Sequence, residues 1–90
     1  MSSADYTQLT FHFQNGQAES FNLPLTPQEL QQQLFYILDK PFVTLHLRDQ
    51  TVAIATSQVV KVEVKPALPE LQGEGVFANC ERVTALNRGR

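Results

Sequence analysis

The sequence predicts an α+β fold in which one helix packs on one face of an antiparallel sheet. Apolar residues occupy alternate positions in three successive runs between residues 43 and 64, which is the pattern of a three-stranded meander. A similar alternation, broken once by a turn, runs from residue 6 to residue 23. Between these regions lies a helix-start signal. We therefore expect one domain over residues 1–90, with the order ββαβββ and a short C-terminal segment.

The first hairpin is predicted over residues 6–23, and its loop length can be argued from the side-chain pattern. A two-residue Asn-Gly loop would set the aromatic face of one strand beside the polar face of the other. A three-residue loop at residues 14–16 instead aligns Leu9 with Phe21. It also uses Gly16 where a type I turn with a bulge needs a left-handed residue. The longer loop is the prediction.

A helix is predicted at about residues 27–39. Thr26 has the side chain of an N-cap, Pro27 suits the first helical position, and Glu29 completes a capping box. Pro41 ends the helix, because proline disfavours helical geometry in the residue before it. The apolar residues at helical spacing form the expected buried stripe: Leu30, Leu34, Ile37 and Leu38.

The meander is predicted to follow the helix and to present one apolar face to it. A two-residue loop at residues 49–50 pairs Leu47 with Val52, and a further short loop pairs Val52 with Val62. Both loops keep the apolar side chains on the same face. The residues expected to be buried there are Leu45, Leu47, Val52, Ile54, Val60 and Val62.

The C-terminal segment, residues 67–90, has a weaker pattern with two open interpretations. One is a short helix, and the other is an extended stretch at residues 82–86. We expect a docked helical or irregular segment, with frayed ends at residues 1–5 and 87–90. The face of the short helix would consist of Val76, Phe77, Cys80, Val83 and Thr84.

Composition favours a soluble cytoplasmic protein without a membrane segment. The chain has no run near the roughly 20 apolar residues that a membrane span requires. It also lacks a basic segment followed by an apolar one at its start. Cys80 is the only cysteine, so no disulfide can form within the chain. A reducing compartment fits these features.

Positive charge gathers in the second half of the sequence, although the net charge is −2. Residues 1–39 contain no Lys or Arg, whereas residues 40–66 contain more cations than anions. Nucleic acid is disfavoured as a partner, because the net charge is negative and the expected basic face carries no aromatic side chains. Binding of nucleic acid or another anionic ligand is the second hypothesis. Its contact residues would be Arg48, Lys61 and Lys65.

Catalysis is the third hypothesis, and its candidate residues are His12, His46 and Cys80. Both histidines have the strand parity opposite to that of the core, which predicts side chains on the outer face. A zinc site needs at least three protein ligands, and no third ligand lies at a supporting spacing. Cys80 is expected to be a small buried thiol. No enzyme activity, metal or cofactor is therefore predicted.

The outer sheet face supports the first hypothesis, a non-catalytic interaction or assembly module. Two small uncharged residues, Ala53 and Ala55, lie on this face, which the predicted fold leaves uncovered. The expected partner is another protein or a second copy of the chain, and no small-molecule ligand is indicated. The candidate interface residues are Thr44, His46, Ala53, Ala55 and, on a flank of the helix, Tyr36.

Overall fold

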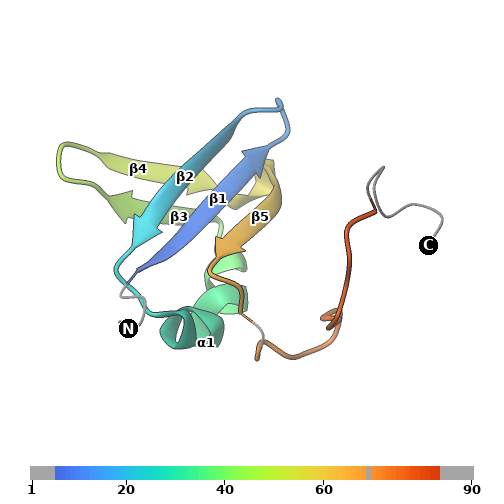
Figure 1. The fold of residues 1–90 in the computed structure, drawn as a ribbon. Helices are drawn as coiled ribbons and strands as arrows, with labels where there is room; N and C mark the ends of the chain where they lie inside the picture. The colour runs from blue at the N-terminus through green and yellow to red at the C-terminus, as the bar shows by residue number, and fades with distance from the viewer. Residues whose placement is uncertain (1–5, 69, 84–90) are drawn as a thin grey trace.

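Strands and a helix follow each other in the order ββαβββ in the computed structural model, which describes residues 6–68 and 70–83. The α+β fold class with antiparallel sheets is therefore confirmed. Helix α1 lies below the sheets, and hairpin β3–β4 crosses behind the sheet that contains β1 (Figure 1). The elements are β1 (Thr7–Phe13), β2 (Ala18–Leu23), α1 (Pro27–Leu38), β3 (Phe42–His46), β4 (Thr51–Ala55), the short 3-10 helix η1 (Thr56–Gln58) and β5 (Val59–Lys65).

The first hairpin has the predicted three-residue loop. Leu9 pairs with Phe21 across β1 and β2, as the side-chain pattern indicated. The loop is closed by the Gly16 amide, which donates to the Phe13 carbonyl at 3.0 Å. Gly16 has a φ of +89°, a left-handed conformation that residues with a side chain rarely adopt. Loop length and register are thus both confirmed for this hairpin.

The predicted register of the β3–β4 hairpin is wrong by two residues. Leu45, not Leu47, pairs with Val52, so that the loop has four residues. The Leu47 amide closes this loop by donating to the Gln50 carbonyl at 2.7 Å. A shift of two residues preserves the alternation of faces, which is why the apolar pattern could not exclude it. Leu47 consequently lies in the loop and is 37% exposed instead of buried.

The predicted pairing of β4 with β5 is also wrong, because β5 pairs with β1. The strands form two sheets, one in the order β2-β1-β5 and one containing β3 and β4. Val62 lies opposite Phe11, and the ladder is irregular near Phe13. Val60, expected in the core, is 63% exposed beside this irregularity. The η1 turn between β4 and β5 carries the chain from one sheet to the other.

Helix α1 begins with the predicted capping box. The Glu29 amide donates to Thr26 Oγ1 at 3.2 Å, and the Thr26 amide donates to Glu29 Oε1 at 2.9 Å. Asp39 is the C-cap, so the predicted end is confirmed as well. Within residues 6–68 and 70–83, no helix combines the length and the apolar character needed to cross a bilayer.

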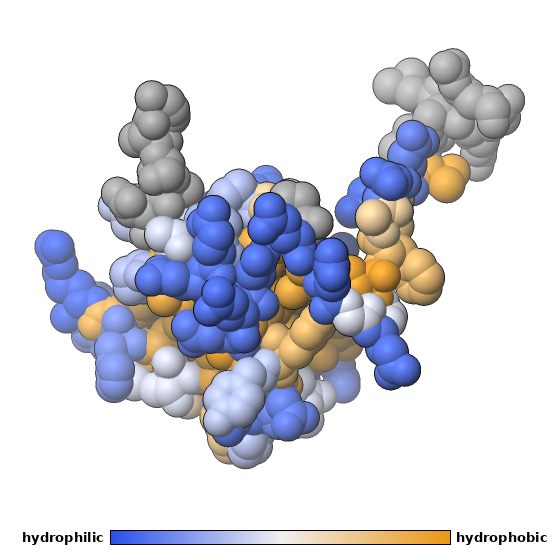
Figure 2. Space-filling view, turned by 90° about the horizontal axis from the view of Figure 1, so that it is seen from below, coloured by the Kyte–Doolittle hydropathy of each residue, from blue (hydrophilic) through white to orange (hydrophobic). Residues whose placement is uncertain are grey.

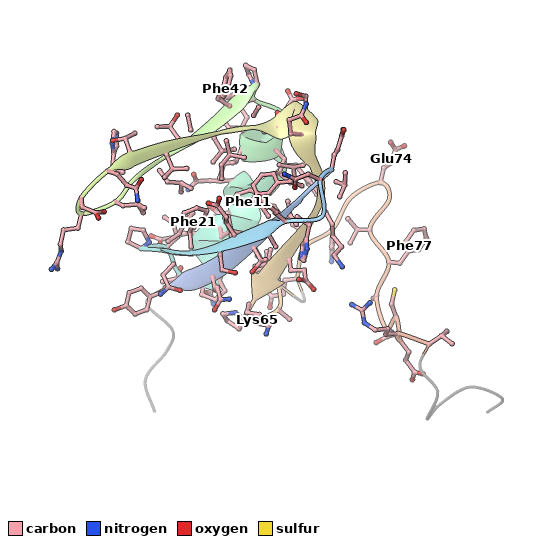
Figure 3. The ribbon with its side chains drawn as sticks, turned by 90° about the horizontal axis from the view of Figure 1, so that it is seen from above. Phe11, Phe21, Phe42, Lys65, Glu74 and Phe77 are labelled. Carbon is pink, nitrogen blue, oxygen red and sulfur yellow. The ribbon has the colours of Figure 1, made fainter. Side chains whose placement is uncertain are left out.

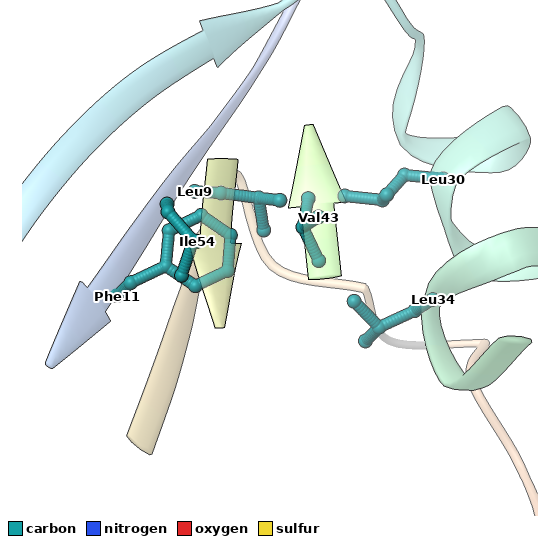
Figure 4. Close-up of a cluster of buried hydrophobic side chains, with 6 residues drawn as sticks. All are labelled: Leu9, Phe11, Leu30, Leu34, Val43 and Ile54. Carbon is teal, nitrogen blue, oxygen red and sulfur yellow. The ribbon is translucent and has the colours of Figure 1, made fainter. Parts of the chain in front are cut away.

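The core lies where side chains of both sheets meet one face of α1 (Figure 4). Phe11 points into the space between the two sheets (Figure 3), and its ring centroid lies 6.1 Å from that of Phe21. The hydroxyl of Thr7 is fully buried and donates to the Leu25 carbonyl at 2.7 Å. The buried apolar residues are Leu9, Phe11, Leu30, Leu34, Val43 and Ile54.

The C-terminal segment is irregular over its described part, residues 67–68 and 70–83. Leu68 and Leu71 pack against the core, so the beginning of the segment is docked as expected. The helical alternative is wrong for the described residues, and Phe77 and Val83 are both exposed. Thr84 and the predicted frayed ends lie outside the described residues.

Candidate interaction surface

The outer face of hairpin β3–β4 gathers four of the five predicted interface residues. Thr44 lies directly opposite Ala53, and His46 lies opposite Thr51, with 3.0 Å between His46 Nδ1 and Thr51 Oγ1. Phe42 is opposite Ala55 and is itself exposed. Phe42 was not among the predicted interface residues, although its even position gives it the parity of Thr44 and His46. The four residues brought together are Thr44, His46, Ala53 and Ala55.

Tyr36, the fifth predicted interface residue, is exposed on α1. Its ring stacks under the Lys40 ammonium, with 4.2 Å from Nζ to the ring centroid. Tyr36 also lines a hollow of about 320 Å³ together with Phe42 and Thr44. The helix flank and one edge of the β3–β4 hairpin therefore share a surface.

The three predicted anion contacts are divided between a loop and a strand. Arg48 lies in the loop that joins β3 and β4. Lys61 and Lys65 lie on β5, opposite His12 and Gln8 of β1. The tip of hairpin β3–β4 and strand β5 lie on opposite sides of the molecule in Figure 1. Only the two lysines share a strand.

The candidate catalytic residues are likewise separated. His12 belongs to β1 and His46 to β3, in different sheets. Cys80 was expected to be buried but is exposed, and its Sγ lies 3.5 Å from the Phe77 carbonyl oxygen. Among the residues that the structure describes, no three His, Cys, Asp or Glu side chains are grouped so that they could hold a metal ion.

His12 forms a hydrogen-bonded pair with Glu63 on the outer face of the β2-β1-β5 sheet. Nε2 of His12 donates to Oε1 of Glu63 at 2.7 Å, and both side chains are partly exposed. This hydrogen bond is the main cause that lowers the pKa of Glu63 below its ordinary value. The charges of Lys61 and Arg82 act in the same direction. Glu63 is thus held as a carboxylate on β5.

A groove between α1 and β5 is the surface that sequence reasoning missed. Its volume is about 370 Å³, and most of its lining is apolar. Phe35 of α1 is 52% exposed there, although it is a large aromatic side chain. The exposed Val60 of β5 lies across the groove. The principal apolar side chains of the groove are Leu34, Phe35, Leu38, Val60, Val62 and Val64.

A second hollow continues the groove toward the C-terminal segment. Its volume is about 550 Å³, and it shares Leu34, Val62 and Val64 with the groove. Leu68 and Leu71 of the C-terminal segment also line it. In Figure 2, which views the molecule from the helix side, apolar surface gathers where the C-terminal segment leaves the body. Apolar surface therefore extends along β5 beyond the groove itself.

Strand β5 is an edge strand over the described part of the chain. It pairs with β1 on one side, and no described strand pairs with it on the other. An edge strand presents a row of backbone donors and acceptors to which another strand can add. On the outer face of β5, Lys61, Glu63 and Lys65 alternate in charge. The edge therefore combines an apolar side, an alternating charged side and unpaired backbone groups.

Comparison with protein-family models, with curated proteins and with solved structures finds no match.

Proposed function

We propose that this chain is a non-catalytic interaction or assembly module that binds an extended segment of a protein partner along the edge of β5. The observation that carries the proposal is the apolar groove of about 370 Å³ beside this edge. Phe35 and Val60 are exposed on opposite walls of the groove. Covering such large apolar side chains contributes about 25 cal/mol per Å² of surface removed from water.

Strand addition uses both the free edge of β5 and the apolar groove beside it. The backbone of an added segment pairs with the free edge of β5, and this pairing supplies affinity. Every second side chain of the segment then points toward the groove beside Val62 and Val64, where apolar residues fit best. The proposed partner segment is therefore extended, with apolar side chains at alternate positions.

The outer face of hairpin β3–β4 is a second candidate surface. The exposed Phe42, opposite Ala55, adds a large apolar contact to the small residues of this face. The groove has stronger support, because the exposed Phe35 and Val60 lie on its opposite walls, whereas Phe42 is the only large exposed apolar side chain that the structure describes on the β3–β4 face. Anion binding through Arg48, Lys61 and Lys65 has less support, since Arg48 lies in the loop between β3 and β4 whereas both lysines lie on β5.

A photo-crosslinking experiment separates the two protein-binding surfaces. The photoreactive amino acid p-benzoylphenylalanine replaces Phe35 in one variant and Ala53 in another, in cells that make the protein naturally. We expect a discrete crosslinked product from position 35, and we expect Val60→Asp to abolish it. A product from position 53 alone would indicate that the partner binds the β3–β4 face and not the groove. No product from either position would refute an interaction role for both surfaces.

The proposed site of action is the cytoplasm. Cys80 is exposed and unpaired with another cysteine, and a reducing compartment keeps such a thiol free.

A further inference from the structure

We propose that the segment bound along β5 is β5 of a second copy, paired antiparallel so that Val62 faces Val62 of the other chain. This inference rests on the proposed function and names its partner. It combines the free edge of β5 with the alternating charges of Lys61, Glu63 and Lys65. The product would be a six-stranded sheet in the order β2-β1-β5-β5-β1-β2.

Symmetry restricts the registers that two identical strands can adopt. Two antiparallel copies of one strand are related by a two-fold axis perpendicular to the sheet. Side chains that face α1 in one copy therefore face the same side in the other. The central residue pairs with itself, and the residue before it faces the residue after it. Each possible register is thus defined by its central residue.

The charges of β5 select among these registers. With Val62 at the centre, Lys61 faces Glu63 of the other copy, and Glu63 faces Lys61. The two-fold axis produces both contacts, which join opposite charges. Lysine on an edge strand normally discourages pairing. In this register the Lys61 of each copy meets a carboxylate, so its charge favours pairing.

The other registers have specific defects. Centring on Lys61 or on Glu63 places identical charges directly opposite each other, which destabilises the pair. Centring on Val64 pairs Glu63 with Lys65, but it brings Pro66 into the ladder. Proline has no backbone donor, and this register uses only the end of β5. The register centred on Val62 extends furthest along the strand.

The apolar side of β5 is consistent with the same register. Val60 of one copy faces Val64 of the other, so exposed and partly buried valines meet across the new ladder. The two-fold axis also places the two α1–β5 grooves on the same side of the sheet. Each exposed Phe35 then borders the apolar surface of the other copy. Such an interface closes on itself and leaves neither β5 edge free.

Charge reversal in pairs of variants tests the register. In the Lys61→Glu variant, the new carboxylate at position 61 faces Glu63 of the other copy, so two negative charges are opposed. In the Glu63→Lys variant, the new lysine at position 63 faces Lys61 of the other copy, so two positive charges are opposed. We expect sedimentation velocity to show a wild-type dimer at micromolar concentration. For each variant alone we expect the dissociation constant to rise about tenfold or more, because two contacts change sign.

Mixing the two variants restores opposite charges at both contacts. We therefore expect an equimolar mixture to form a heterodimer with close to wild-type affinity, which also demonstrates that both variants fold. Lys65→Glu is the matched control, because in this register residue 65 faces Val59 and should leave the dissociation constant nearly unchanged. If Lys65→Glu dissociates the dimer and Lys61→Glu does not, the register centred on Val62 is overturned.

The second-copy proposal and the proposed function can fail separately. A wild-type chain that stays monomeric up to millimolar concentration overturns the second-copy proposal. If position 35 nevertheless crosslinks to a different protein, the interaction function stands with another partner. If the position 35 product has twice the mass of the chain, the second copy is supported in cells as well.

Discussion

His12 and Glu63 join the first and last strands of the described fold, 51 positions apart in sequence. Nε2 of His12 donates to Oε1 of Glu63 at 2.7 Å across the β1–β5 ladder. The same contact is the largest cause of the lowered pKa of Glu63. Because the carboxylate is better stabilised in the folded chain than in the unfolded chain, the pair contributes stability that depends on pH.

Glu63→Gln should remove this pH-dependent contribution. A lowered folded-state pKa means that the contribution is present above the ordinary value of 4.5 and is lost as pH falls through the folded-state pKa. We expect the variant to melt at a lower temperature than wild type at pH 7. This difference should shrink as pH is lowered below 4.5. Thermal unfolding from pH 7 to pH 3 measures it, with Glu19→Gln, exposed on β2, as the control. A difference that does not vary with pH would contradict the assignment.

Thr7→Val should destabilise the fold by about 1 to 3 kcal/mol, the cost of leaving a buried polar group unsatisfied. The substitution keeps the size of the side chain but removes the hydroxyl that donates to the Leu25 carbonyl. Urea denaturation measures the change. Thr10→Val is the matched control, because Thr10 Oγ1 lies 2.7 Å from Ser20 Oγ at an exposed site. Equal effects of the two substitutions would show that the buried hydrogen bond contributes no more to the free energy of unfolding than the exposed one.

Thr26→Ala should cost about 1 kcal/mol, which is typical for the loss of an N-cap. The variant loses the oxygen that accepts from the Glu29 amide. Gln28→Ala is the control within the same helical turn, since Gln28 is exposed and alanine favours the helix. Thermal unfolding of both variants checks the prediction. A Thr26→Ala midpoint equal to that of wild type would show that the cap contributes nothing measurable.

Ile54→Ala and Leu47→Ala together test the register of the β3–β4 hairpin. Ile54 is 5% exposed within the core, so its truncation should cost about 2 to 5 kcal/mol. Leu47 lies in the loop, and we expect its truncation to cost about 1 kcal/mol or less. Urea denaturation gives both values. Similar costs would favour the register in which Leu47 pairs with Val52.

The helix and the first hairpin could be predicted because their signals are local. Thr26 and Glu29 are three positions apart, and their capping contacts form within one turn of chain. The loop of the first hairpin is decided by Gly16 and by the need to put Leu9 and Phe21 on one face. The two candidate loops of the hairpin differ in which residues face the core, so the apolar pattern could choose between them.

The pairing of the last three strands required the tertiary structure. Alternation determined that Ile54 and Val62 face the core, but a register shift of two residues leaves every face unchanged. The pattern could therefore not place Leu47 in a loop, nor choose β1 instead of β4 as the neighbour of β5.

The residues that line the groove also depend on strand pairing, and therefore on the tertiary structure. Phe35 and Val60 are 25 positions apart, and nothing in the local sequence indicates that they line the same groove. They line one open groove because β5 joins the outer edge of the β2-β1-β5 sheet, where no described strand covers it. Local sequence determined which residues are apolar and which elements they form. Only the choice of neighbouring strands, made by packing around Leu9 and Phe11, decided which apolar side chains stay exposed.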